Sequence, residues 1–149
     1  MRTPPCVVRG KRVSEGSGTR GLLDTSVIVD FGKVIDDPEA LLPERADISA
    51  IALAELSAGP LLTDDPDERA RRLQLLQRVQ AEFDPLPFDD RCAAAYARVA
   101  AVTRASGRSH RSRVADLLIA ATALAHQLPL YTRNPDLAHL ARTLDVVAV

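Results

Sequence analysis

Asp24 is the first of several acidic side chains in this 149-residue chain whose positions suggest chemistry. It directly follows the short apolar run at residues 21–23. A short apolar run bounded by glycine predicts a strand buried on both faces. Side chains just beyond the carboxyl end of such a strand are well placed to bind a ligand. Asp24 is therefore a candidate for chemistry, and the alternative is that it only caps a following helix.

Two further acids lie in apolar surroundings. Asp116 falls in the first turn of a helix predicted at 113–127, whose apolar residues surround nearly the whole circumference, so the helix should be central. The helix dipole favours an acid in the first turn, so it explains the position of Asp116. It does not explain why the rest of the helix is so apolar. Glu55 is the only charged residue between 49 and 62. It should be paired or bound to a cation in the core, unless it faces solvent on a half-exposed helix.

A fourth acid, Asp136, comes two residues after Asn134, just past a strand predicted at 128–132. By itself this pattern is also typical of an ordinary turn that starts a helix. Acids at strand ends and helix starts predict one negative pocket, in which carboxylates stay ionised only beside a cation. Oxygen ligands without His or Cys favour Mg²⁺, with Mn²⁺ as a substitute. Hard ions held in this way usually serve phosphoryl chemistry.

The composition limits the class of protein. The chain is long enough for one domain with an aliphatic core, because aromatic residues make up only 3% of it. The formal net charge of -1 excludes a bulk basic protein, so nucleic-acid binding would need local basic patches. One candidate patch precedes the Asp116 helix, although a solvated loop is almost as good an interpretation. It comprises Arg104, Arg108, His110, Arg111 and Arg113.

Two cysteines are too few for a disulfide framework or a zinc site, which fits a reducing compartment. The longest clean apolar run is too short to span a membrane, and charges interrupt the first residues where a signal peptide would be apolar. We therefore expect a cytoplasmic protein.

Helices and strands alternate along the chain, which predicts an α/β fold with a parallel sheet covered on both faces. Residues 1–20 are rich in Pro, Gly, Ser and Arg and are interpreted as a flexible extension, with the domain at 21–149. Strands are predicted at 21–23, 47–49, 83–88, 128–132 and 145–149, and helices at 25–31, 50–58, 67–82, 90–106, 113–127 and 135–144.

Four blocks of sequence together resemble PIN-domain ribonucleases, and most closely the VapC-type toxins of bacterial toxin–antitoxin systems. They are residues 22–26, Glu55 with its neighbours, residues 115–123 around Asp116, and residues 131–134. The resemblance covers 21–149 and implies a three-layer α/β/α domain with a central parallel sheet. It also implies a Mg²⁺- or Mn²⁺-dependent endoribonuclease, a homodimer, and a small VapB-like antitoxin that blocks the acidic pocket.

The resemblance assigns roles to individual residues. Asp24, Glu55 and Asp116 match the metal-binding acids of the family. The fourth acid of the family usually stands three residues after the Asn and precedes an aromatic residue, whereas Asp136 stands two after Asn134 and precedes Leu. The hypothesis is that Asp24 and Asp116 bind the ion directly, and that Glu55 acts through water. Asp136 would help to hold a second ion or the scissile phosphate. The candidate substrate-binding residues are Thr25, Ser26, Asn134, Arg111 and Arg113.

Other classes of protein remain as alternatives. The main one is a catalytically impaired PIN-fold binding module, which the irregular fourth acid would favour. A phosphate-accepting receiver domain needs a buried lysine late in the chain, but the only lysines are Lys11 and Lys33. A hydrolase with a Ser or Cys nucleophile has no supporting motif here.

Overall fold

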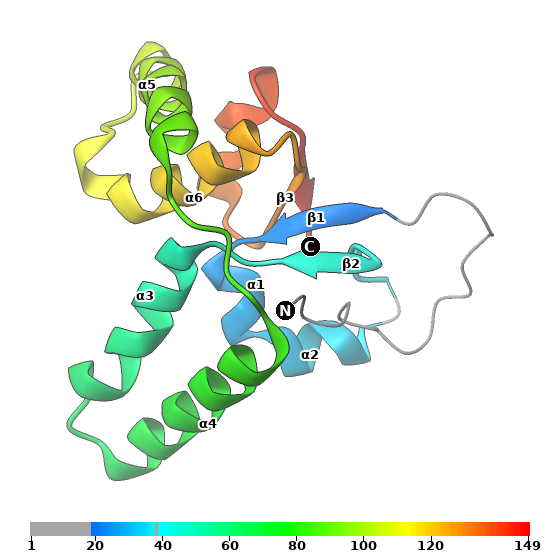
Figure 1. The fold of residues 1–149 in the computed structure, drawn as a ribbon, viewed down its shortest axis with the longest axis vertical. Helices are drawn as coiled ribbons and strands as arrows, with labels where there is room; N and C mark the ends of the chain where they lie inside the picture. The colour runs from blue at the N-terminus through cyan, green and yellow to red at the C-terminus, as the bar shows by residue number, and fades with distance from the viewer. Residues whose placement is uncertain (1–18, 38) are drawn as a thin grey trace.

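The computed structural model describes residues 19–37 and 39–149, and it contains a four-stranded parallel sheet (Figure 1). Residues 1–18 of the predicted extension lie outside the described residues. The strand order is β2-β1-β3-β4. The strands are β1 (Arg20–Leu23), β2 (Arg45–Asp47), β3 (Leu130–Thr132) and β4 (Val146–Ala148).

The two central strands are the apolar ones. Leu22 of β1 pairs with Leu130 of β3, and both side chains are fully buried, as expected for strands covered on both faces. Gly21 is required by this packing, because the ring of Tyr131 occupies the space that a Cβ atom would need. The carboxyl ends of β1 and β3 therefore lie side by side, with Asp24 and Thr132 at the same edge of the sheet.

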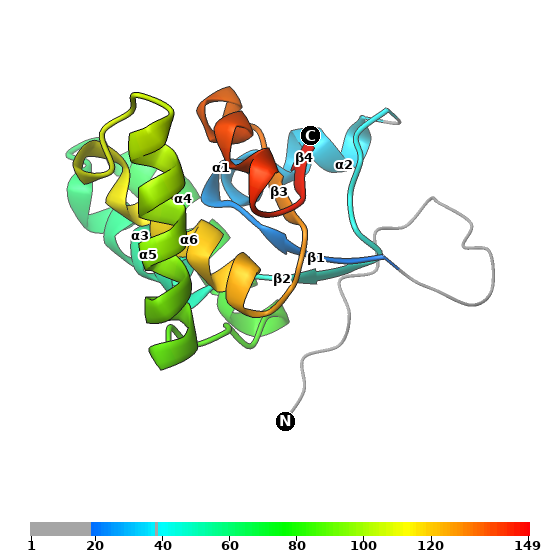
Figure 2. The same ribbon diagram turned by 90° about the horizontal axis from the view of Figure 1, so that it is seen from above.

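Helices complete the α/β/α fold, and Figures 1 and 2 show α5 and α6 side by side. The most buried helix is α6, in which Leu117, Ile119 and Ala120 are fully buried, so the predicted central helix is confirmed. No helix in the described part of the chain has the length and apolarity needed to cross a membrane. The α-helices are α1 (Thr25–Val29), α2 (Phe31–Asp36), α3 (Ala50–Ala58), α4 (Pro66–Glu82), α5 (Asp90–Ala105) and α6 (Val114–Ala125). The 3-10 helices are η1 (Gly59–Leu62), η2 (Arg111–Arg113) and η3 (Pro135–Arg142).

Several predicted elements differ from the observed ones. The strand predicted at 83–88 is reduced to one bridge between Ser49 and Leu86, because two prolines remove donors from this segment. The helix predicted at 25–31 is divided at Asp30 into α1 and α2, and Gly32 lies within α2 instead of ending a helix. The strand predicted at 47–49 lies two residues earlier, and the last predicted helix is the 3-10 helix η3.

Candidate active site

Asp24 is buried at the end of β1, with only 1% of its surface exposed. Its Oδ2 atom accepts hydrogen bonds from Ser26 Oγ at 2.7 Å and from Thr132 Oγ1 at 2.8 Å. Its side chain makes no capping hydrogen bond to α1, so the structure does not support the helix-cap alternative. No donor within residues 19–37 and 39–149 reaches the buried Oδ1 atom. A buried carboxylate oxygen without a donor is costly, and a cation would satisfy it.

Asp116 lies in the first turn of α6, where it is partly buried. Burial, together with the negative charges of Asp24 and Glu55, raises the pKa of Asp116 to about 6. The positive charge of Arg113 opposes this rise in pKa. Asp116 therefore faces a negative field from two acids that are distant in the sequence.

Glu55 is exposed on α3, which corrects the expectation of a carboxylate in the core. Only one side of α3 is buried, through Ala52 and Leu56, and Glu55 lies away from that side. The alternative of a half-exposed helix is therefore right. The carboxylate is nevertheless directed toward the start of α1, because Thr25 Oγ1 donates to Glu55 Oε1 at 2.7 Å.

Asp136 is exposed at the start of η3 and is tied to its neighbours. Its carboxylate pairs with Arg113, with 2.9 Å between Oδ2 and Nη1, and this hydrogen bond lowers the pKa of Asp136. Its backbone N–H donates to Asn134 Oδ1 at 3.0 Å. The Asn134 amide in turn lies 3.5 Å from Asp116 Oδ2, at the outer limit of a hydrogen bond. The Asn134–Asp136 turn thus joins the same acidic edge.

The donor set fits a hard divalent cation, because it consists of carboxylate oxygens and one of them is buried without a donor. These side chains do not form a complete metal site as they stand. Across residues 19–37 and 39–149, no group of three His, Cys, Asp or Glu side chains is arranged to hold a metal ion. The acids therefore surround a negative pocket that is not a closed set of ligands.

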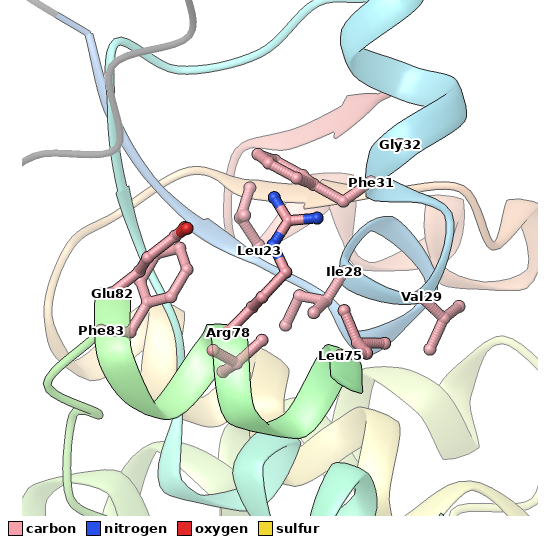
Figure 3. A pocket seen from close by; sticks show the side chains of 10 residues that line it. Leu23, Ile28, Val29, Phe31, Gly32, Leu75, Arg78, Glu82 and Phe83 are labelled. Carbon is pink, nitrogen blue, oxygen red and sulfur yellow. The ribbon is translucent and has the colours of Figure 1, made fainter. Parts of the chain in front are cut away.

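Two hollows lie beside α1. One, of about 700 Å³, is bounded by Thr25 and Glu55 at the acidic edge and by Arg71 and Arg72 of α4. The other, of about 60 Å³, is mainly apolar, and the Arg78 side chain lies across it in Figure 3. None of the four candidate acids lines the smaller hollow, whereas Glu55 lines the larger one.

Thr132 is a site residue for which we predicted no role. It holds Asp24 Oδ2 from β3, and its Oγ1 atom also accepts from the Asn134 backbone N–H at 3.0 Å. The sequence signal was the hydroxyl at the end of a predicted strand. Thr132 reaches Asp24 only because β3 pairs with β1, and local sequence does not specify that pairing. Of the predicted substrate-binding residues, Thr25 and Ser26 contact acids of the site, whereas Arg111 is exposed on η2.

Comparisons with known proteins agree with this geometry. The family model described as PIN domain matches residues 21–143. Ribonuclease VapC5 of Mycobacterium tuberculosis is 40% identical over 87% of this chain and 95% of that protein. The structure of VapBC-5, a toxin–antitoxin system from Mycobacterium tuberculosis, matches with a TM-score of 0.75 and 38% identity, over 88% of this chain and 99% of that chain. FitAcB from Neisseria gonorrhoeae matches with a TM-score of 0.66 and 30% identity, over 84% and 94%. The chain therefore belongs to the PIN-domain family and, within it, to the VapC-type branch.

Proposed function

We propose that this protein is a metal-dependent endoribonuclease that acts as the toxin of a type II toxin–antitoxin pair. The observation that carries the proposal is the convergence of four acids from β1, α3, α6 and η3 beside the carboxyl ends of the central strands. The name of the relative at 40% identity, a ribonuclease, supports the same reaction class. The substrate would be RNA, and the reaction the hydrolysis of a phosphodiester bond.

Asp24 and Asp116 would hold Mg²⁺, or Mn²⁺ in its place, with Glu55 and Asp136 completing the negative pocket. When bound, the ion supplies charge neutralisation and activation of water. The hydroxyls of Ser26 and Thr132 orient Asp24 by occupying Oδ2, which leaves Oδ1 free of protein donors within the described residues. Thr25 orients Glu55, which is then placed to accept a proton from the attacking water.

RNA would approach from the side formed by the C-terminal part of the chain. Residues 89–149 contain eight arginines and five acids, whereas residues 19–88 contain seven Lys or Arg and fourteen acids. Arg104, Arg108 and Arg111 are exposed, and the charge of Arg108 helps to lower the pKa of Asp136. Arg108 is thus close enough to the acidic edge to hold a phosphate beside it, and Arg104 and Arg111 would extend the positive surface along the RNA. Arg113 is mainly occupied by Asp136, so it would orient that acid as well as attract RNA.

The natural partner would be a small VapB-like antitoxin that covers the acidic pocket, and the working unit a homodimer in the cytoplasm. The support for an antitoxin comes from the matched VapBC-5 structure, whose description names a toxin–antitoxin system. Inhibition of RNA cleavage by one equivalent of the antitoxin from a neighbouring gene would test this partner.

A PIN-fold binding module without catalysis is the second candidate. It is favoured by the pairing of Asp136 with Arg113 and by the lack of a complete metal site among the described residues. In that case the protein would bind RNA or a partner without cleaving a bond.

Cleavage of RNA by purified, antitoxin-free protein tests the proposal. The assay compares Mg²⁺, Mn²⁺ and EDTA, and it compares wild type with Asp116→Asn and with the matched control Asp145→Asn, an exposed acid next to β4. Ion-dependent cleavage that persists in Asp145→Asn and disappears in Asp116→Asn is the expected result. If tRNA and ribosomal fragments stay intact and Mn²⁺ does not bind, the binding-module alternative is preferred.

A further inference from the structure

The turn that carries Asn134 and Asp136 makes a third contact, with His139, which has no part in the proposed function. Besides its carboxylate and its N–H, the backbone carbonyl of Asp136 is also occupied, because it lies 2.7 Å from His139 Nδ1. A carbonyl oxygen only accepts, so Nδ1 must carry the proton and donate it. His139 therefore fixes the backbone of Asp136 directly.

The other ring nitrogen connects this turn to α5. His139 Nε2 lies 2.9 Å from Thr103 Oγ1, and Thr103 is fully buried on the core side of α5. Thr103 Oγ1 also lies within hydrogen-bond distance of the Val99 carbonyl, at 2.8 Å. The threonine hydroxyl can donate to a neutral Nε2 or accept from a charged one, so the link persists in both protonation states.

We propose that His139 is a positioning residue that fixes the Asn134–Asp136 turn against α5, so that Asn134 and Asp136 face Asp116. We call the two contacts of His139, with the Asp136 carbonyl and with Thr103, the brace. The role of the brace at the site rests on the proposed function, whereas its effect on the turn does not. The brace is needed because η3 is a 3-10 helix, whose own hydrogen bonds have poorer geometry than those of an α-helix. Without it, the Asp136 carbonyl would lose its partner, and the acid itself would be held by the exposed ion pair to Arg113 and by the Asn134 side chain.

The alternative is that His139 only stabilises the packing of η3. The packing of η3 against the core depends on other side chains, because Leu137 and Leu140 are fully buried there. His139 is half-buried. Its replacement should therefore leave η3 attached to the core while it loosens the preceding turn.

Hydrogen exchange at the amides of Asp136 and Leu137, measured by NMR without metal or RNA, separates the two roles. Both amides donate within the turn, to Asn134 Oδ1 and to the Asn134 carbonyl. His139→Leu keeps the side-chain volume and should speed exchange at both amides by about tenfold, with the rest of α5 and α6 unchanged. His139→Asn keeps a donor for the Asp136 carbonyl but is too short to reach Thr103, so it should restore part of the protection. His126→Leu, at the far end of α6, is the matched control.

Thr103→Val removes the distal partner without changing the size of the side chain. It should speed exchange at the same two amides, and the double variant with His139→Leu should add nothing further, because both changes break one chain of contacts. Unchanged exchange in His139→Leu, or additive effects in the double variant, would overturn the brace.

Cleavage then decides whether the brace serves the site. In a protein that cleaves RNA, His139→Leu should lower kcat by about tenfold with KM unchanged, and His139→Asn should recover part of that loss. Equal kcat in His139→Leu and wild type would overturn the positioning role. If wild type does not cleave RNA, the proposed function fails, and the exchange measurements still decide the brace.

Discussion

The four acids of the site form two pairs with different environments. The inner acids are Asp24, which is almost fully buried, and Asp116, which is partly buried on the most apolar helix. The outer acids are Glu55 and Asp136, which are both exposed. Each outer acid has a fixed partner, Thr25 for Glu55 and Arg113 for Asp136. The inner acids have no positively charged hydrogen-bond partner in the described part of the chain.

The difference in burial predicts different effects of the two pairs on metal binding and on the stability of the fold. Charges in a poorly solvated place repel strongly and also bind a cation strongly, because little water screens either interaction. Exposed charges interact weakly in both respects. The inner acids should therefore govern metal binding at a cost to stability, whereas the outer acids should adjust the reaction at almost no cost.

The largest loss of cleavage should come from the two inner acids, and Asp24→Asn should cause it without a change in stability. The amide oxygen can still accept from Ser26 and Thr132, so the fold should persist, but the charge that would attract the ion is lost. We expect cleavage to fall about a thousandfold and Mn²⁺ affinity to fall in parallel, as measured by initial rates and calorimetry. Asp145→Asn is the control, because Asp145 is an exposed acid next to β4. A rate above one-tenth of wild type would remove Asp24 from the inner pair.

Asp116→Asn should lose activity and gain stability. The pKa of Asp116 is about 6 in the folded protein and 3.8 in an unperturbed carboxyl group, so the folded state resists ionisation. The unfolded chain ionises first, and the fold loses stability as pH rises from about 4 to about 6, with a constant deficit above that range. Partial solvent exposure reduces the deficit to about 1–2 kcal/mol.

Thermal unfolding in EDTA measures this deficit. At pH 7.5 the Tm of Asp116→Asn should exceed that of wild type by several degrees, and the difference should vanish at pH 4, where Asp116 is protonated in both states. Mg²⁺ should raise the Tm of wild type but not of the variant. A variant that is less stable than wild type at pH 7.5 would show that the crowding of acids is not a source of strain.

Among the outer acids, Glu55→Gln should have a smaller effect. The Gln oxygen can still accept from Thr25, so only the charge is removed. We expect about a tenfold fall in kcat with unchanged Tm, since the side chain is exposed. The pKa of Asp116 should fall, because one repelling charge is gone, and NMR titration of its carboxyl carbon would measure this change. An effect as large as that of Asp24→Asn would place Glu55 with the inner acids.

The smallest effect should come from the exposed arginines Arg104 and Arg108. In the Asp116→Asn background, Arg104→Gln with Arg108→Gln should weaken RNA binding several-fold. The salt dependence of log Kd should decrease by about 0.7 for each lost phosphate contact. Arg78→Gln, in the acidic part of the chain, is the matched control and should leave the slope unchanged. Equal slopes for all three proteins would show that RNA follows another surface.

Local sequence predicted the inner acids better than the outer ones. Asp24 directly follows the buried residues of β1, and Asp116 lies within α6, whose other residues are almost all apolar or small. Such elements are buried wherever they lie in an α/β fold. Glu55 lies on a helix that is equally apolar in sequence, yet half of that helix faces solvent. The periodicity of α3 does not indicate which side is covered, because almost every residue is apolar or small.

Contacts between distant residues could not be predicted in this way. Thr132 holds Asp24 only because β3 pairs with β1, and His139 reaches Asp136 and Thr103 only because η3 packs against α5. The shortened Asn134–Asp136 turn is another example. Its spacing suggested an irregular site, and the structure shows it held by Asn134, Arg113 and His139.

The chain's own order of residues was enough to establish the α/β class, the central helix α6 and the candidate acids, because these follow from short-range apolar patterns and breaks in them. Tertiary structure alone decided which acids are buried, which are paired and which charges raise the pKa of Asp116. The physical reason is that burial and electrostatic interaction depend on distances across the fold. Parallel pairing of β1 and β3 brings together side chains that lie more than a hundred residues apart in the sequence.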